Sequence, residues 1–143
     1  MSTERTRETM QGYVEALLSS GDFARYLAGD VVLEFMGTDR KVQGREQVRQ
    51  LITFVHEQAF RTAVELKSLV CDGDRAAAEV EFVGTHIAEF EGIPASHRAV
   101  RLPYTVAYDV DDDGIRSLRL YFPLEELLRQ IGTAADVRIP QTV

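Results

Sequence analysis

The chain has 143 residues, of which 45% are hydrophobic and 27% are charged, and its formal net charge is −7 at pH 7. This length predicts one domain with a self-sufficient core and room for one pocket. The negative charge argues against nucleic acid as a partner, because affinity for a phosphate backbone rests on lysine and arginine.

Cys71 is the only cysteine, so the sequence predicts neither an internal disulfide nor a cysteine-based metal site. A single thiol is typical of a reducing compartment, and we expect a cytoplasmic location. No apolar run follows the polar N-terminal residues, so no signal peptide is expected. No stretch has the length needed to cross a bilayer, which argues against a membrane partner.

Apolar spacing in the N-terminal half switches between the helical and the strand period. Residues 3–20 are predicted to form an amphipathic helix whose buried stripe includes Met10, Tyr13 and Leu17. The next predicted elements are a short helix over 23–27, a strand over 31–36, a return strand over 41–43, a helix over 44–59 and an alternating strand over 61–71.

Three long strands are predicted in the C-terminal half, over residues 75–86, 98–109 and 115–122. A turn at 111–114 joins the last two, and a polar, glycine-containing loop over 89–96 joins the first two. Long strands joined in this way form a twisted antiparallel sheet, whose hollow side must be filled by helices or by a ligand. The predicted fold is α+β, a curved antiparallel sheet covered by the N-terminal helices.

A short C-terminal helix is predicted after Pro123, with Leu124, Leu127 and Ile131 on one face and Gly132 at its end. We therefore expect a single domain over residues 1–132. Residues 133–143 form a C-terminal tail that is expected to be flexible or to lie over a neighbouring subunit.

Several motifs in the strands and loops resemble those of the SnoaL-like polyketide cyclase family, which belongs to the NTF2-like superfamily. The matching segments are Gly84-Thr85-His86, Phe90-x-Gly92-Ile93-Pro94-Ala95, the strand from Tyr104 to Asp109, Asp113-Gly114-Ile115 and Leu127-Leu128-x-Gln130-Ile131-Gly132. The resemblance implies an NTF2-like cone with a deep apolar pocket between sheet and helices. It also implies a homodimer that packs through the sheet.

The last strand departs from the family pattern. Family cyclases and epoxide hydrolases commonly carry an acidic residue there, two places after a tryptophan. In this sequence those positions are Leu118 and Leu120, and the chain contains no tryptophan. The histidine of the Gly-Thr-His motif is retained as His86, so the family's usual acid is missing while another titratable group remains.

The resemblance implies that Leu120 faces the pocket, and strand alternation extends this assignment to neighbouring positions. The expected pocket-lining residues are Val32, Met36, Phe82, Leu102, Val106, Leu118, Leu120 and Phe122.

Glu34, His86 and Tyr104 are the candidate catalytic residues. A carboxylate at Glu34 that faced the pocket would be desolvated and suited to proton transfer; alternatively it faces solvent or pairs with an arginine. His86 would polarise a carbonyl or move a proton, or else hold the following loop. Tyr104 would donate a hydrogen bond to a substrate oxygen, or only pack in the core. His56 and His97 are expected at the surface.

These candidates favour a cofactor-independent cyclase or isomerase that acts on an apolar, polyketide-like carbonyl compound by acid–base chemistry. The alternative is a non-catalytic protein that binds a small apolar metabolite, in keeping with the loss of the acid at Leu120. An epoxide hydrolase is a lesser alternative, and a pocket filled by its own side chains would leave an interaction protein. No metal is expected, because no histidine–carboxylate spacing fits a metal-binding helix.

Overall fold

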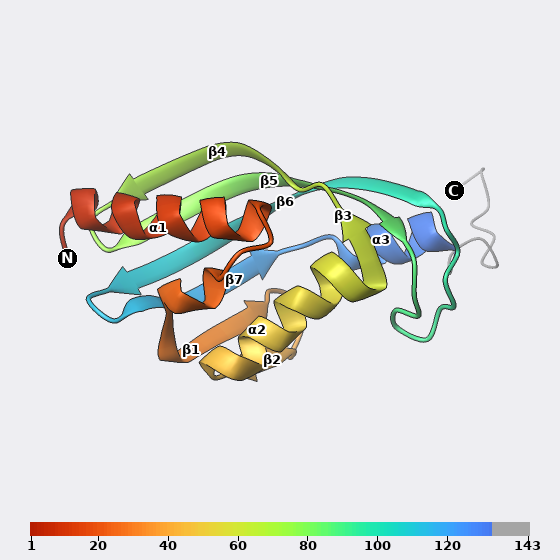
Figure 1. Cartoon of the computed structure of the whole chain (residues 1–143), viewed down its shortest axis with the longest axis horizontal. Helices are drawn as coiled ribbons and strands as arrows, with labels where there is room; N and C mark the ends of the chain where they lie inside the picture. Colours follow the sequence, from red (N-terminus) through yellow and green to blue (C-terminus); the bar gives the residue numbers. More distant parts are fainter. Residues whose placement is uncertain (133–143) are drawn as a thin grey trace.

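The computed structural model of the chain describes residues 1–132 (Figure 1). Its helical segments are α1 (Thr3–Leu18), the 3₁₀ turn η1 (Phe23–Tyr26), α2 (Arg45–Thr53), the π-helical turn η2 (Phe54–Ala59) and α3 (Leu124–Ile131). Its strands are β1 (Leu27–Phe35), β2 (Lys41–Gln43), β3 (Phe60–Thr62), β4 (Glu65–Asp72), β5 (Arg75–His86), β6 (Ala99–Asp111) and β7 (Gly114–Tyr121). The tail predicted over 133–143 lies outside the described residues.

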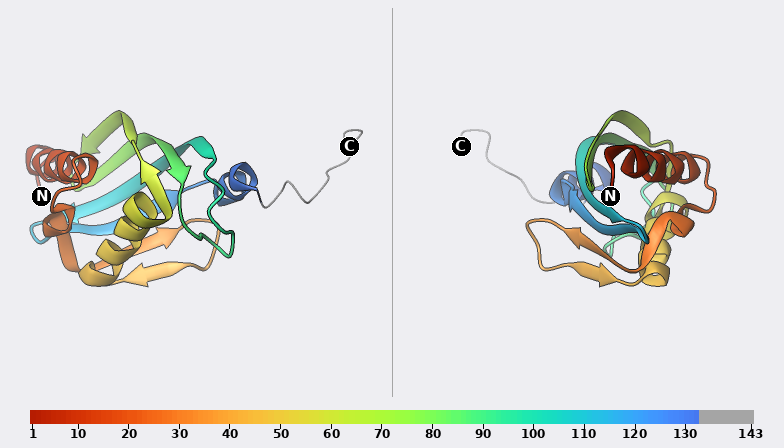
Figure 2. Two further views of the ribbon diagram at one scale, coloured as in Figure 1. Left: turned by 45° about the vertical axis from the view of Figure 1, so that its right-hand side comes forward. Right: turned by 90° about the vertical axis from the view of Figure 1, so that its left-hand side faces the viewer.

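All seven strands form one sheet in the order β2-β1-β7-β6-β5-β3, and β4 pairs with the same strand β5 as β3 does. Every pairing is antiparallel except that of β1 with β7, which is parallel. The sheet curls strongly, and α1, η1 and α2 lie within its curve (Figure 2). The predicted α+β fold, an NTF2-like cone covered by N-terminal helices, is confirmed.

Helix α1 contacts the sheet through its apolar stripe and, at the β4–β5 turn, through polar side chains. Met10 and Tyr13 are buried against the sheet. The buried Thr6 hydroxyl donates to the carbonyl of Gly73 at 2.6 Å, and the Gly73 N–H donates to the Thr3 hydroxyl at 2.8 Å. These bonds satisfy backbone groups of the β4–β5 turn and fix the helix over that end of the sheet.

The turn between β6 and β7 requires glycine at its last position. Gly114 has a φ of +117°, and a Cβ atom there would lie 2.5 Å from the carbonyl oxygen of Tyr26. Only a residue without a side chain allows β7 to begin this close to η1. Gly114, which marked a turn in the sequence, is therefore also required for the packing of β7 against η1.

Element boundaries differ from the sequence prediction most clearly in three places. The strand predicted over 31–36 begins four residues earlier, since β1 starts at Leu27. The strand predicted over 61–71 is divided into β3 and β4, which pair with different parts of β5. The helix predicted over 44–59 is α-helical only to Thr53 and continues as the π-helical turn η2. No helix among residues 1–132 is both long and apolar enough to cross a membrane.

Candidate functional site

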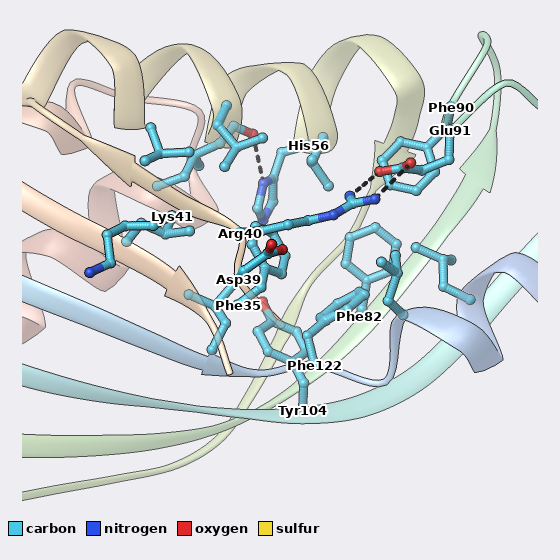
Figure 3. A pocket seen from close by; sticks show the side chains of 18 residues that line it. Phe35, Asp39, Arg40, Lys41, His56, Phe82, Phe90, Glu91, Tyr104 and Phe122 are labelled. Atoms are coloured by element: carbon cyan, nitrogen blue, oxygen red, sulfur yellow. Dashed lines mark hydrogen bonds and ion pairs between the residues drawn. The ribbon is translucent and has the colours of Figure 1, made fainter. Parts of the chain in front are cut away.

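A cavity of about 530 Å³ lies between α2 and η2 on one side and the concave face of the sheet on the other (Figure 3). Pockets for small molecules are typically about 300–1,000 Å³ and mostly apolar. Most of the lining is apolar, from Leu33, Phe35, Val42, Leu51, Ile52, Val55, Phe82, Phe90, Leu120, Phe122, Leu124 and Leu127. The remaining lining residues are Asp39, Arg40, Lys41, His56, Glu91 and Tyr104.

Aromatic rings build the floor of the cavity. The Phe122 ring packs edge-on against Phe82 and Tyr104, with centroid distances of 5.9 and 5.1 Å. The ring of His56 lies 6.2 Å from that of Phe82, also in an edge-to-face arrangement. These contacts restrict the orientation of the two titratable rings, His56 and Tyr104.

His56, on η2, is one of the residues that line the cavity. Its Nδ1 lies 2.8 Å from the carbonyl oxygen of Ile52. A carbonyl only accepts, so Nδ1 carries the proton and Nε2 of the neutral ring bears the lone pair. Nε2 is buried and has no hydrogen-bond partner among residues 1–132. Burial lowers the pKa of His56, against the effect of its bond to Ile52, so the ring is neutral at pH 7.

Tyr104, on β6, supplies a hydroxyl that stays protonated. Burial raises its pKa to about 12, so at neutral pH the group is an O–H donor. The rings of His56 and Tyr104 enter the cavity from opposite sides in Figure 3, the first from the helix and the second from the sheet. The site therefore combines a neutral base and a neutral acid in a cavity whose lining is mostly apolar.

Charged side chains gather at one edge of the cavity. Asp39, Arg40 and Lys41 come from the β1–β2 hairpin, and Glu91 comes from the loop between β5 and β6. The Arg40 guanidinium pairs with Glu91 through two hydrogen bonds, of which Nη2 to Oε2 measures 3.2 Å. This contact lowers the pKa of the Glu91 carboxyl, which is ionised at neutral pH.

Of the residues predicted to line a pocket, Phe82, Leu120 and Phe122 line this cavity, together with Tyr104. Leu102, Val106 and Leu118 are buried in the adjoining core clusters instead. Val32 lies in β1 at a position opposite in parity to the lining residues Leu33 and Phe35, and Met36 follows the last residue of that strand.

Glu34 also belongs to the outer face of the sheet, which corrects the prediction of an inward carboxylate. Its neighbours Leu33 and Phe35 line the cavity, and successive side chains of a strand alternate. In the strand register Glu34 lies opposite Lys41 of β2 and Arg119 of β7. Both flanking residues are cationic, whereas burial in the apolar cavity would penalise a charged carboxylate.

His86 lies at the start of the loop between β5 and β6 and is fully buried. Its Nδ1 accepts a hydrogen bond from the Ser96 N–H at 3.0 Å and lies 2.9 Å from the Ser96 hydroxyl. The ring packs on Phe60 with a centroid distance of 5.3 Å. His86 thus contacts the loop rather than the cavity, which matches the structural alternative considered for it from the sequence.

His56 is the residue that the sequence prediction misplaced. It was expected at the surface but lines the cavity and is partly buried. A signal was present in the sequence, because Val48, Ile52 and His56 are spaced by four residues and continue one buried stripe. The π-helical turn that carries His56 is a further indication, since such turns frequently occur at functional sites.

Stability is expected to decrease between about pH 6.5 and pH 5 because of the buried histidines. Burial lowers the pKa of both His56 and His86, so the folded protein binds their protons less tightly than the unfolded chain does. Below the usual histidine pKa of about 6.5 the unfolded chain takes up more protons, and the free energy of unfolding falls. Urea denaturation at about pH 7.5 and about pH 5.5 measures the difference.

The variant His56→Gln is expected to lose less stability over this pH interval than the parent protein, because one of the two groups no longer titrates. His97→Asn is the matched control, since His97 is exposed at a positive φ that asparagine tolerates. Equal losses in His56→Gln and the parent would contradict the role given to His56.

Within residues 1–132, no group of three or more histidine, cysteine, aspartate or glutamate side chains is arranged to hold a metal ion. The polar residues of the cavity are instead suited to hydrogen bonding and proton transfer with an organic ligand.

The chain is similar to one protein family and to several solved structures. The pattern of the SnoaL-like polyketide cyclase family matches residues 8–131. Among solved structures the chain is similar to a protein named as a SnoaL-like polyketide cyclase from Jannaschia sp. CCS1, with 18% identity, a TM-score of 0.80 and coverage of 91% of this chain and 93% of that one. No curated protein matches the chain.

Two further solved structures have the same fold. A protein named as a polyketide cyclase from Xanthomonas campestris pv. campestris is 23% identical, with a TM-score of 0.76 and coverage of 92% of this chain and 99% of that one. A protein named as a ketosteroid isomerase from Kribbella flavida DSM 17836 is 24% identical, with a TM-score of 0.64 and coverage of 84% and 78%.

Proposed function

The chain belongs to the SnoaL-like polyketide cyclase family, and on that premise we propose that it is a cofactor-independent cyclase or isomerase of an apolar, polyketide-like carbonyl compound. The observation that carries the proposal is that two titratable residues line the same cavity: the neutral His56, whose buried Nε2 lacks a partner among the described residues, and Tyr104. The ketosteroid isomerase fold relative and the family assignment favour chemistry at a carbon next to a carbonyl.

The proposed reaction begins with proton transfer from carbon to nitrogen. His56 Nε2 takes a proton from the carbon beside the substrate carbonyl, and the electron pair of that C–H bond forms the C=C bond of an enolate. The Tyr104 O–H donates a hydrogen bond to the enolate oxygen as charge develops there. The His56 imidazolium, still bound to the Ile52 carbonyl, keeps the proton inside the cavity.

The enolate then has two possible fates that use the same residues. In an isomerisation, the imidazolium returns the proton to a different carbon of the conjugated system. In a cyclisation, the enolate carbon forms a bond to a second carbonyl carbon of the same molecule, and the new alkoxide takes the proton from His56. Both are neutral overall and require no external oxidant or reductant, in keeping with an enzyme without a cofactor.

Deuterium exchange into 2-tetralone tests the first step without knowledge of the natural substrate. This bicyclic ketone is apolar and has acidic protons beside its carbonyl. We expect the protein to accelerate their exchange in D₂O above the rate in buffer alone, as followed by proton NMR. Binding of 2-tetralone without any acceleration would reject the enzyme and support the non-catalytic alternative.

Replacing Tyr104 with phenylalanine is expected to slow this exchange by about 10²–10³-fold, the usual effect of removing one oxyanion-stabilising donor. The ring contact with Phe122 is retained, so the affinity for 2-tetralone should change little. The exchange rate constant at saturating ketone measures the effect. Tyr121→Phe is the control, because that tyrosine is exposed; similar losses in both variants would contradict the proposal.

A protein that only binds a small apolar metabolite is the second candidate. It is favoured by Leu120, which lines the cavity at the position where family members commonly carry an acid. An epoxide hydrolase is less well supported, because it needs a carboxylate to activate water. Glu91, one of the lining carboxylates, is engaged by Arg40.

A further inference from the structure

The loop between β5 and β6, residues 87–98, is firmly held where it leaves the sheet. The backbone N–H of His86 donates to the Arg98 carbonyl at 3.0 Å, and the N–H of His97 donates to the His86 carbonyl at 2.9 Å. The hydrogen bond from Ser96 to the buried His86 ring adds a side-chain contact at the same place. The base of the loop is therefore an extension of the sheet.

The tip of the loop is a compact turn that forms part of the cavity wall. Phe90 and Ile93 exchange two backbone hydrogen bonds of 3.0 and 2.9 Å. Glu91 and Gly92 between them have φ values of +50° and +79°. Phe90 lines the cavity and packs on Phe60 at a centroid distance of 5.2 Å. The tip thus places the Phe90 side chain in the cavity wall. It directs the Glu91 carboxylate toward the edge of the cavity that lies across from the loop.

The opposite edge is the β1–β2 hairpin, and it is also well ordered. The Thr38 hydroxyl donates to the Phe35 carbonyl at 2.7 Å and accepts from the Arg40 N–H at 3.0 Å. Arg40 extends from this turn to Glu91, across the space between His56 and Tyr104 in the view of Figure 3. The ion pair therefore bridges two edges of the cavity that lie 51 residues apart in the sequence.

We propose that the Arg40–Glu91 ion pair is the latch of a flap, residues 89–93, that admits ligands to the cavity. The pair is accessible to water, with 50% and 31% of the two side chains exposed. Such pairs contribute little net free energy, so water and salt compete with this contact and it opens readily. When it opens, the tip moves away with Phe90 and uncovers the apolar interior. The proposal rests on the cavity being a ligand site, and not on its chemistry.

Stopped-flow fluorescence of 2-naphthol, an aromatic probe that is uncharged at neutral pH, tests the latch. In Glu91→Gln we expect the association and dissociation rate constants to rise together by about two- to fivefold, with the dissociation constant nearly unchanged. The charge-reversed double variant Arg40→Glu/Glu91→Arg should restore the parent rates. Glu89→Gln, an exposed carboxylate of the same loop, is the matched control and should behave as the parent does.

Salt provides a second readout on the parent protein. Raising the ionic strength from about 0.1 to about 1 M shortens the screening length from about 10 to about 3 Å. Both rate constants should rise in the parent and remain constant in Glu91→Gln. Unchanged rates in Glu91→Gln, a faster dissociation alone, or a parent that does not bind 2-naphthol would each overturn the latch. Because no turnover is measured, these results are independent of whether 2-tetralone is deuterated.

Discussion

Replacing His56 with glutamine is expected to slow the deuteration of 2-tetralone by about 10²–10⁴-fold, the range typical of general acid–base catalysis. Glutamine can still donate a hydrogen bond to the Ile52 carbonyl, the contact that Nδ1 of His56 makes at 2.8 Å. It has no basic nitrogen to place where Nε2 lies. The variant therefore separates loss of the base from loss of the local structure, provided that its urea denaturation shows a folded protein.

The pH dependence of the exchange rate gives an independent test of the same residue. Burial lowers the pKa of His56, so the base form persists on the acid side of the usual histidine value of about 6.5. The rate constant should stay level down to that pH and decrease only below it. The proton transfer would belong to another group if the exchange rate constant already began to decrease at a pH above about 7. The same would follow if the His56→Gln protein exchanged at the parent rate. His97→Asn should leave the profile unchanged.

Replacing Phe60 with alanine is expected to lower the free energy of unfolding by about 3–5 kcal/mol, the usual cost of removing a buried phenylalanine. The side chain of Phe60 is 0% exposed. Its ring packs against three others, with centroid distances of 5.3 Å to Phe82, 5.3 Å to His86 and 5.2 Å to Phe90. The variant removes the centre of the cluster that supports both the flap and the cavity floor. Urea denaturation at neutral pH measures the loss.

Phe54→Ala is the matched control for this prediction. Phe54 is 36% exposed, and its ring stacks on Phe90 at a centroid distance of 6.4 Å. Its replacement is expected to cost less than about 1 kcal/mol, because the position already contacts water. Comparable losses in the two variants would mean that Phe60 does not organise the cluster.

Local patterns were sufficient to predict the architecture. The turn residues at 111–114 and the alternation along residues 75–86 indicated a sheet, and both β6–β7 and β5–β6 pair as adjacent antiparallel strands. Strands β5, β6 and β7 follow one another in the sequence and are also neighbours in the sheet. Their pairing can therefore be predicted from local sequence patterns. The division between β3 and β4 depends on how each pairs with β5, and this was not readable from alternation alone.

The direction of the β1 side chains could not be predicted as reliably. The assignment of Glu34 to the cavity came from strand parity, which leaves open which of the two faces of a strand is the inner one. The pairing of β1 with β7 decides this, because Leu33 lies opposite Leu118 and Phe35 lies opposite Leu120. Leu33 and Phe35 occupy the cavity face, where apolar side chains are favoured over a carboxylate.

Two other features of the site depend on contacts between distant segments. Only the fold brings Arg40 to Glu91, because α2, η2, β3, β4 and β5 all lie between them in the sequence. The environment of His56 depends likewise on Phe82 of β5 and on the carbonyl of Ile52. The stripe of Val48 and Ile52 continues to His56, although a surface position was predicted for it, and no local pattern sets the tautomer of its ring.

The parallel pairing of β1 with β7 has a consequence for synthesis on the ribosome. It joins Leu33 to Leu118 and Phe35 to Leu120, so β1 gains its principal neighbour only after the last strand has been translated. Until then the nascent chain holds a hairpin of β1 and β2 with an apolar edge exposed. Parallel contacts between remote segments form late and slowly, and this edge is the part of the growing polypeptide that most needs protection from association with other chains.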